Sequence, residues 1–239
     1  MKKVVVLNTK GGCGKTTITT NLAAYHAMAG YRTTLMDYDP QGSSTRWLSK
    51  REETRPRVNS IAAFERNTRV THSFQLRAPL DTEYLFIDTP AGLDPHLLTE
   101  ITRNAHAVVV PVLPSDIDIH AASRCIADLL LIARIDRRED RIAVVANRAN
   151  KNTRIYHALT RFLPAWTSPS SPPFVIPRTT STASNRASAF TRCRTTACCA
   201  IAATGNRCWT GFTAARRIPC RRSMARHARA KPSAERCSS

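Results

Sequence analysis

The chain has 239 residues and a formal net charge of +19, and this length suits one sizeable α/β domain with its own core. No stretch approaches the roughly 20 apolar residues of a membrane-spanning helix, which excludes an integral membrane protein. The first apolar run, residues 4–7, is too short for a secretion signal. We therefore expect a cytoplasmic protein that makes no membrane contact.

Short apolar runs alternate with helical patterns along the first two thirds of the chain. This alternation predicts a mostly parallel sheet with helices on both faces, which is the fold of P-loop NTPases. Residues 49–80 are polar and irregular, and we expect a loop there. The predicted strands are 4–7, 33–36, 84–87, 107–112 and 142–146, and the predicted helices are 16–28, 95–104, 117–133 and 153–163.

A glycine-rich segment follows the first predicted strand and precedes the first predicted helix. Backbone N–H groups in such a loop, together with the helix N-terminus, favour a bound phosphate group. Lys15 would neutralise the β- and γ-phosphates, and Thr16 would ligate Mg²⁺. The segment therefore predicts a site for ATP and Mg²⁺, formed by Lys10, Gly11, Gly12, Cys13, Gly14, Lys15, Thr16 and Thr17.

Three motifs resemble one known family. The segment Lys10–Thr17, K-G-G-C-G-K-T-T, resembles the deviant Walker A motif of the ParA/MinD ATPases. The segment Asp37–Ser43 resembles the switch I of that family, and Phe86–Gly92 resembles its Walker B and switch II segment. The resemblance covers residues 1–163.

This resemblance implies roles for individual residues. Lys10 would reach across an ATP-sandwiched dimer to the phosphates of the partner. Asp39 would hold the attacking water close to the metal ion. Asp88 would lie near Mg²⁺, through a water molecule. Asn147 lies where relatives read the edge of the adenine base.

The resemblance also implies a function. Relatives are dimerisation switches that bind and hydrolyse ATP and position plasmids, chromosomes or other cargo. A homodimer would form on ATP binding, and a partner protein would stimulate hydrolysis. The implied location is the cytoplasm, in association with the nucleoid. Relatives bind DNA non-specifically through basic C-terminal positions, which this chain lacks.

Two alternatives remain open at this point. Asp116 and Asp118 either cap the helix that follows Pro114 or take part in nucleotide binding.

The chain could also be an iron–sulfur reductase or an amidoligase of the wider superfamily. Such a reductase needs cluster cysteines after the later strands, and Cys125 within a predicted helix does not supply them.

The composition changes at about residue 164. Residues 165–239 contain 13 Lys and Arg, a single acidic residue and six of the eight cysteines. Read one base out of frame, permitted codons for Val175–Ser181 encode D-T-Q-N-Y-V, and those for Thr204–Phe212 encode W-E-P-L-L-D-W-L. Both resemble C-terminal segments of ParA/MinD relatives.

We therefore expect two parts: an incomplete P-loop ATPase domain at 1–163, and an out-of-frame, basic, irregular or disordered tail at 164–239. The alternative to the ATPase function is that the chain is a non-functional or poorly folded product of a frameshifted gene.

Overall fold

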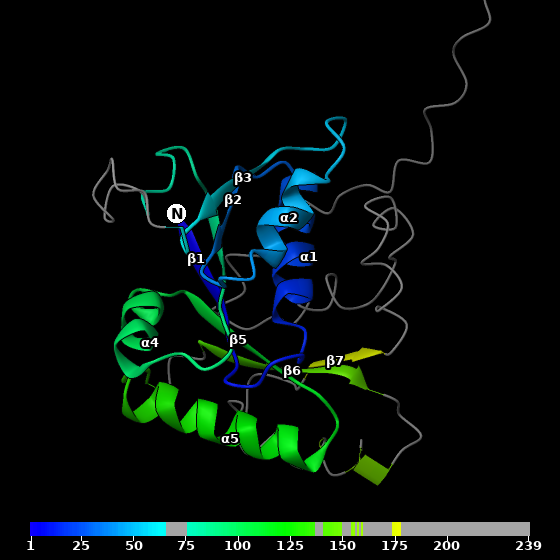
Figure 1. The fold of residues 1–239 in the computed structure, drawn as a ribbon, viewed down its shortest axis with the longest axis vertical. Coiled ribbons are helices and arrows are strands. Elements are labelled where there is room, and N and C mark those ends of the chain that lie inside the picture. The colour runs from blue at the N-terminus through cyan, green and yellow to red at the C-terminus, as the bar shows by residue number, and fades with distance from the viewer. Residues whose placement is uncertain are drawn as a thin grey trace, which may run out of the picture.

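The computed structural model describes residues 1–65, 76–136, 141–149, 154, 155, 157, 159 and 174–177. For residues 174–177 it describes the backbone only. Strands and helices alternate along this part of the chain (Figure 1). The elements are β1 (Lys2–Val6), α1 (Lys15–Met28), β2 (Thr33–Asp37), α2 (Ser43–Ser49), β3 (Val58–Ala62), β4 (Tyr84–Asp88), α4 (Pro95–Thr102), β5 (Ala107–Val112), α5 (Asp116–Leu131), β6 (Ile142–Ala149) and β7 (Phe174–Pro177).

The described strands form one parallel sheet in the order β3-β2-β4-β1-β5-β6-β7. The first strand, β1, lies in the middle, between β4 and β5. The chain leaves β1 toward β2 on one side, and later fills β5 and β6 on the other side. Ligands of open parallel sheets bind at the carboxyl ends of strands where the direction of winding changes. The predicted fold class is confirmed.

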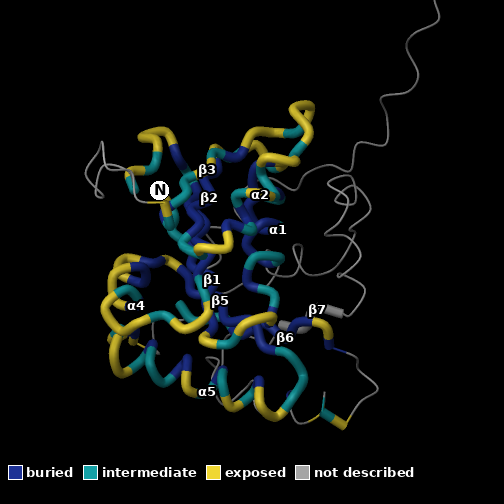
Figure 2. Tube along the Cα trace, viewed as in Figure 1, coloured by how far each residue is buried: buried dark blue, intermediate teal, exposed yellow. Residues whose placement is uncertain are grey.

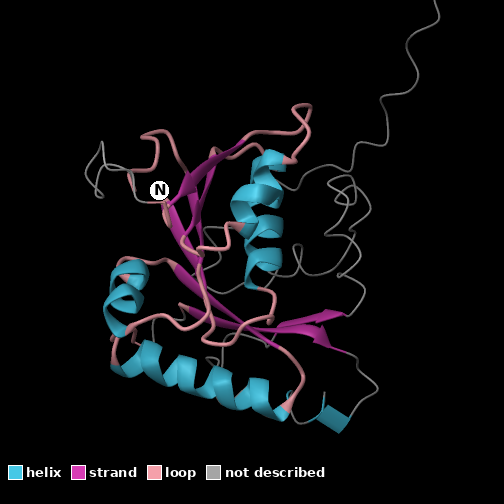
Figure 3. Cartoon of the chain, viewed as in Figure 1, coloured by secondary structure: helices cyan, strands magenta, loops and turns pink. Residues whose placement is uncertain are grey.

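Helices cover both faces of the sheet (Figure 3). On one face, Val4 and Val6 of β1 pack in a core with Leu22 of α1. On the other face, Val5 of β1 packs in a core that includes Ile126 of α5 and residues of α4. Neighbouring residues of β1 thus serve opposite cores, as the two-residue period of a strand requires.

Three inner strands, β2, β4 and β5, are buried along their whole length, as Figure 2 shows. All residues of β2, β4 and β5 are buried. A strand that is covered on both faces gains by being apolar at every position, which explains the uninterrupted apolar run of β5.

The prediction of a loop over residues 49–80 is wrong in part. The strand β3 pairs in parallel with β2 from Thr33↔Val58 to Asp37↔Ala62. It is an edge strand with only one buried residue, so its sequence, VNSIA, lacks the apolar run of a central strand. The helix α2, which the sequence analysis did not predict, ends at Ser49.

The predicted helix at residues 153–163 and the predicted tail at residues 164–239 are described only in part. Of the helix predicted over residues 153–163, residues 154, 155, 157 and 159 are helical and the others lie outside the described residues. Within the tail at 164–239, the structure describes the strand β7, which pairs in parallel with β6. The rest of that tail also lies outside the described residues. Among the described helices, none combines the length and apolar character required to cross a bilayer.

Candidate nucleotide-binding site

The loop between β1 and α1 has the backbone of a phosphate-binding loop. Gly12 and Gly14 adopt left-handed conformations with φ of 75° and 95°, which only glycine adopts without strain. Gly14 is the N-cap of α1, and no side chain caps this helix end. Free N–H groups at an uncapped helix N-terminus attract an anion.

Lys15, the first residue of α1, lies folded into this loop. Its side-chain ammonium group donates hydrogen bonds to the carbonyl oxygens of Asn8 at 3.1 Å and Lys10 at 3.0 Å. The residue is only 7% exposed. A buried cation that is held by neutral carbonyls, without a described carboxylate partner, suits a phosphate ligand.

Asn8 is a site residue that the sequence analysis missed. Its Nδ2 donates to the carbonyl oxygen of Pro111 in β5 at 2.7 Å, and its Oδ1 accepts from the N–H of Lys10 at 3.1 Å. Asn8 thus connects the start of the loop to the neighbouring strand. The available signal was a polar residue that directly follows a buried apolar strand.

Lys10 forms an ion pair with Asp118 of α5, at 2.9 Å between Nζ and Oδ2. The Lys10 side chain is 36% exposed, whereas that of Asp118 is 5% exposed. Asp118 Oδ1 has no hydrogen-bond partner among the described residues. Lys10 therefore lies at the rim of the site and neutralises a nearly buried carboxylate.

Of the two alternatives for Asp116 and Asp118, the first does not hold in its simple form, because neither residue is the N-cap. The N-cap of α5 is Ser115, whose hydroxyl oxygen accepts from the N–H of Asp118 at 3.1 Å. Asp116 is exposed in the first turn. Asp118 instead joins the candidate site through Lys10.

The segment after β2 is ordered by Asp37, which is fully buried. Its Oδ1 accepts from the N–H of Asp39 at 3.0 Å, and its Oδ2 accepts from the N–H and hydroxyl of Thr45 at 3.0 and 3.1 Å. Asp39 is half-buried, and its Oδ1 accepts from the N–H of Gln41 at 2.9 Å. Asp37 thus fixes the turn that presents Asp39.

Asp88 ends β4 directly beside Asp37, its registered neighbour in β2. Burial raises the pKa of Asp88 to about 7, and the carboxylates of Asp37 and Asp39 act in the same direction. The hydroxyls of Thr16 and Ser44 favour the ionised form, so they lower this pKa in part. A bound cation next to Asp88 would stabilise the ionised carboxylate and so lower its pKa again.

The residues around Asp88 fit a magnesium ion. Its Oδ2 is buried and has no hydrogen-bond partner of normal geometry in the described part of the chain. Carboxylate and hydroxyl oxygens are the ligands that Mg²⁺ prefers. The Asp88 carboxylate and the Thr16 hydroxyl would therefore hold the ion, together with phosphate oxygens.

Asn147 lies against the phosphate-binding loop. Its Nδ2 donates to the carbonyl oxygen of Cys13 at 2.9 Å, and the residue is 5% exposed. The expected contact with adenine stays a prediction. Cys13 is itself fully buried, and its thiol donates to the carbonyl oxygen of Lys10.

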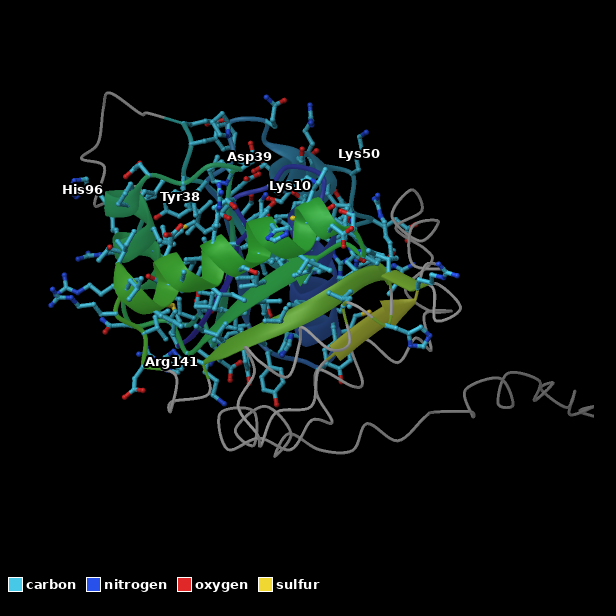
Figure 4. All side chains as sticks on the ribbon, turned by 90° about the horizontal axis from the view of Figure 1, so that it is seen from below. Lys10, Tyr38, Asp39, Lys50, His96 and Arg141 are labelled. Carbon is cyan, nitrogen blue, oxygen red and sulfur yellow. The ribbon has the colours of Figure 1, made fainter. Side chains whose placement is uncertain are left out.

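The structure thus brings the predicted site residues to one end of the sheet. The loop after β4 joins them, since the N–H of Gly92 donates to the carbonyl oxygen of Thr9 at 3.1 Å. Figure 4 shows Lys10 and Asp39 close together in the view beside α5, with Arg141 on the other side. Both described cysteines, Cys13 and Cys125, are buried, so neither offers an exposed thiolate for an iron–sulfur cluster.

A parallel sheet, a glycine-rich loop entering α1 and a buried lysine together define a P-loop nucleotide-binding protein. The family model "CobQ/CobB/MinD/ParA nucleotide binding domain" matches residues 4–188. The chain belongs to this family. The match continues past residue 163, where the sequence analysis expects the ATPase domain to end.

Known proteins agree with this assignment. The maintenance of carboxysome distribution protein A of Halothiobacillus neapolitanus is 30% identical over 159 residues, which cover 65% of this chain and 70% of the relative. The apo McdA structure from Cyanothece matches with a TM-score of 0.59 at 15% identity, over 80% of this chain and 92% of that chain. Cobyrinic acid a,c-diamide synthase from Mycobacterium smegmatis, solved with ADP and magnesium, has a TM-score of 0.54 at 20% identity, over 81% and 95% of the two chains.

Proposed function

We propose that this chain is an ATP-dependent dimerisation switch that positions a cargo inside the cell. One observation carries the proposal: two lysines of the same loop have different environments. Lys15 is buried in the loop, whereas Lys10 is at the rim and held by a single ion pair. Only the lysine at the rim is free to exchange its partner for a phosphate group of a second subunit.

Each residue of the site has a separate task in ATP hydrolysis. Lys15 and the loop amides bind the phosphates and neutralise charge as the γ-phosphoryl group leaves. Asp39 orients the attacking water, and Lys10 of the partner subunit adds positive charge from across the dimer. Mg²⁺, when bound, supplies charge neutralisation at the phosphate oxygens.

The proposed cargo and partners are based on those of the relatives. The carboxysome-distribution relative supports the positioning of a large intracellular body, such as a plasmid, a chromosome or a protein compartment. The proposal includes a homodimer on ATP binding, a partner protein that stimulates hydrolysis, and a cytoplasmic, nucleoid-associated location. Non-specific DNA binding is a family expectation that we do not include in the proposal.

The test is ATP turnover by the full chain with and without Mg²⁺, beside two variants. Lys15→Ala is expected to lose both ATP binding and turnover, because the buried cation is removed. Lys10→Ala is expected to keep ATP binding but to lose ATP-dependent dimerisation, measured by light scattering. Arg46→Ala, an exposed change in α2, is the matched control and should leave both properties unchanged.

Two results would contradict the proposal. Normal turnover by Lys15→Ala would mean that the loop does not hold the nucleotide. Normal dimerisation by Lys10→Ala would leave an ATPase that does not use its rim lysine as a switch.

A further inference from the structure

The strand β6 changes its register against β7 at Asn147 and Arg148. Ala146 pairs with Val175, but the next pair is Ala149 with Pro177, so β6 carries one residue more than β7. Arg148 adopts a left-handed conformation with φ of 54°, which is uncommon for a residue with a side chain. Such bulges redirect side chains, and they are frequent beside functional sites.

Asn147 lies within this bulge, and its side chain packs tightly against the phosphate-binding loop. Its Nδ2 lies 2.9 Å from the carbonyl oxygen of Cys13. A Cβ atom added to Gly14 would lie 2.2 Å from the same nitrogen, so no side chain fits between the loop and Asn147. The amide is therefore in van der Waals contact with the loop backbone as well as hydrogen-bonded to it.

We propose that Asn147 is a positioning residue for the phosphate-binding loop. The peptide between Cys13 and Gly14 is trans, so its C=O and N–H point in opposite directions. The hydrogen bond that holds the Cys13 carbonyl at Asn147 therefore directs the Gly14 N–H away from Asn147. A peptide flip would lose this bond and reverse the N–H that the proposed phosphate site needs.

This inference rests on the proposed function and adds a specific consequence. The support acts on the loop and not on the base, so it concerns every ligand with a phosphate chain. Inorganic tripolyphosphate with Mg²⁺ should depend on Asn147 as strongly as ATP does.

The experiment compares the full chain with two variants, Asn147→Asp and Asn147→Ala. Aspartate keeps the size of the side chain but replaces the donor by an acceptor that repels the Cys13 carbonyl. Calorimetry measures the affinities for Mg²⁺–ATP and Mg²⁺–tripolyphosphate, and hydrogen exchange measures the amides of residues 11–16 without ligand. The control is Asn59→Ala in β3, a half-buried asparagine of the edge strand.

Both Asn147 variants should bind both ligands on the order of tenfold more weakly, which is the effect of losing one hydrogen bond. Their loop amides should exchange faster than in wild type, and the control should match wild type. A loss for ATP alone, with unchanged exchange, would overturn the inference and assign Asn147 to the base. If wild type binds neither ligand, the proposed function fails, and the exchange rates still decide whether Asn147 holds the loop.

Discussion

Asp37 and Asp39 are two residues apart, but their surroundings assign them different tasks. Asp37 is fully buried and accepts hydrogen bonds from Asp39 and Thr45, whereas Asp39 is half-buried at the opening of the site. The first carboxylate serves the fold of the turn. The second is available for chemistry.

Replacing each carboxylate should therefore have a different effect. Asp37→Ala leaves buried donors unpaired, and should lower the free energy of unfolding by on the order of 2–3 kcal/mol, measured by urea denaturation. Asp39→Ala should keep stability and ATP binding but reduce turnover by roughly 10²- to 10⁴-fold. Equal losses of stability in both variants would show that Asp39 is also structural.

His26 should make the fold sensitive to acid. Burial lowers the pKa of His26 to about 4, and its ring is surrounded by Tyr31, Tyr84 and Phe86. The unfolded chain takes up a proton near pH 6.5, but the folded chain does so only near pH 4. The stability that is present above pH 6.5 is therefore lost as the pH falls, by on the order of 3 kcal/mol.

The measurement is urea denaturation at pH 7.5 and pH 4.5. His26→Phe should lose less stability between the two values than wild type does. His96→Phe, at an exposed position of α4, is the control and should behave as wild type. The same pH dependence in His26→Phe and wild type would assign the acid lability to other groups.

At the scale of the element, α5 links the core to the site. Its Ile126 and Leu129 are buried in the core, while Asp118 in its first turn pairs with Lys10. Lys10 must leave this pair in order to reach a partner's phosphates. In the proposed dimer, the free energy of breaking the ion pair between Lys10 and Asp118 opposes dimerisation.

Removing the Asp118 charge should favour the dimer. In Asp118→Asn the side chain keeps its shape but no longer holds the ammonium group of Lys10. The ATP concentration for half-maximal dimerisation should fall by up to roughly fivefold, since partly exposed ion pairs contribute up to about 1 kcal/mol. Light scattering with a slowly hydrolysed ATP analogue measures this shift. A shift to higher ATP concentration would mean that Asp118 supports the dimer.

The elements that could be predicted from the sequence are those that bury a continuous pattern. Residues 107–112 were predicted as a strand with the bounds of β5, because every one of them is apolar and buried. The edge strand β3 could not be found in this way, because Asn59 is half-buried and Ser60 is exposed, so no apolar run marks the strand. Its pairing with β2 also joins segments that are distant in the sequence.

The same limit applies within the site. The glycine-rich loop is contiguous, so its residues could be read from the sequence in one motif. The contacts of Lys10 with Asp118 and of Asn147 with Cys13 join residues more than 100 positions apart. No local sequence pattern encodes these contacts, so they could be identified only in the folded structure.

At the scale of the whole molecule, the chain combines two compositions. We propose that residues 1–163 are the P-loop ATPase domain and that the reading frame is lost near residue 164. The strand β7 and the family match to residue 188 both extend beyond residue 163. The nucleotide sequence of codons 160–215 tests the proposed loss of frame directly.

A heat-unfolding scan should separate the two forms of the protein. Restoring the frame after residue 163 should give a chain whose melting temperature rises with Mg²⁺–ATP. At 100 times the Kd the ligand adds about 2.7 kcal/mol, or roughly 5–10 °C for a domain of this size. The chain as it stands should show a smaller rise. Equal shifts in both chains would mean that the C-terminal segment does not matter for nucleotide binding.

The central place of β1 has a consequence for folding on the ribosome. Lys2 is registered with Tyr84, and Val4 with Ala107, so β1 finds both of its neighbours only after more than 100 further residues have emerged. Such distant pairing slows folding, because a long loop must close before any contact forms. The strand β1 is therefore made well before β4 and β5, and it pairs only when both have emerged. A nascent chain halted before β5 would expose an apolar strand edge for chaperones to cover.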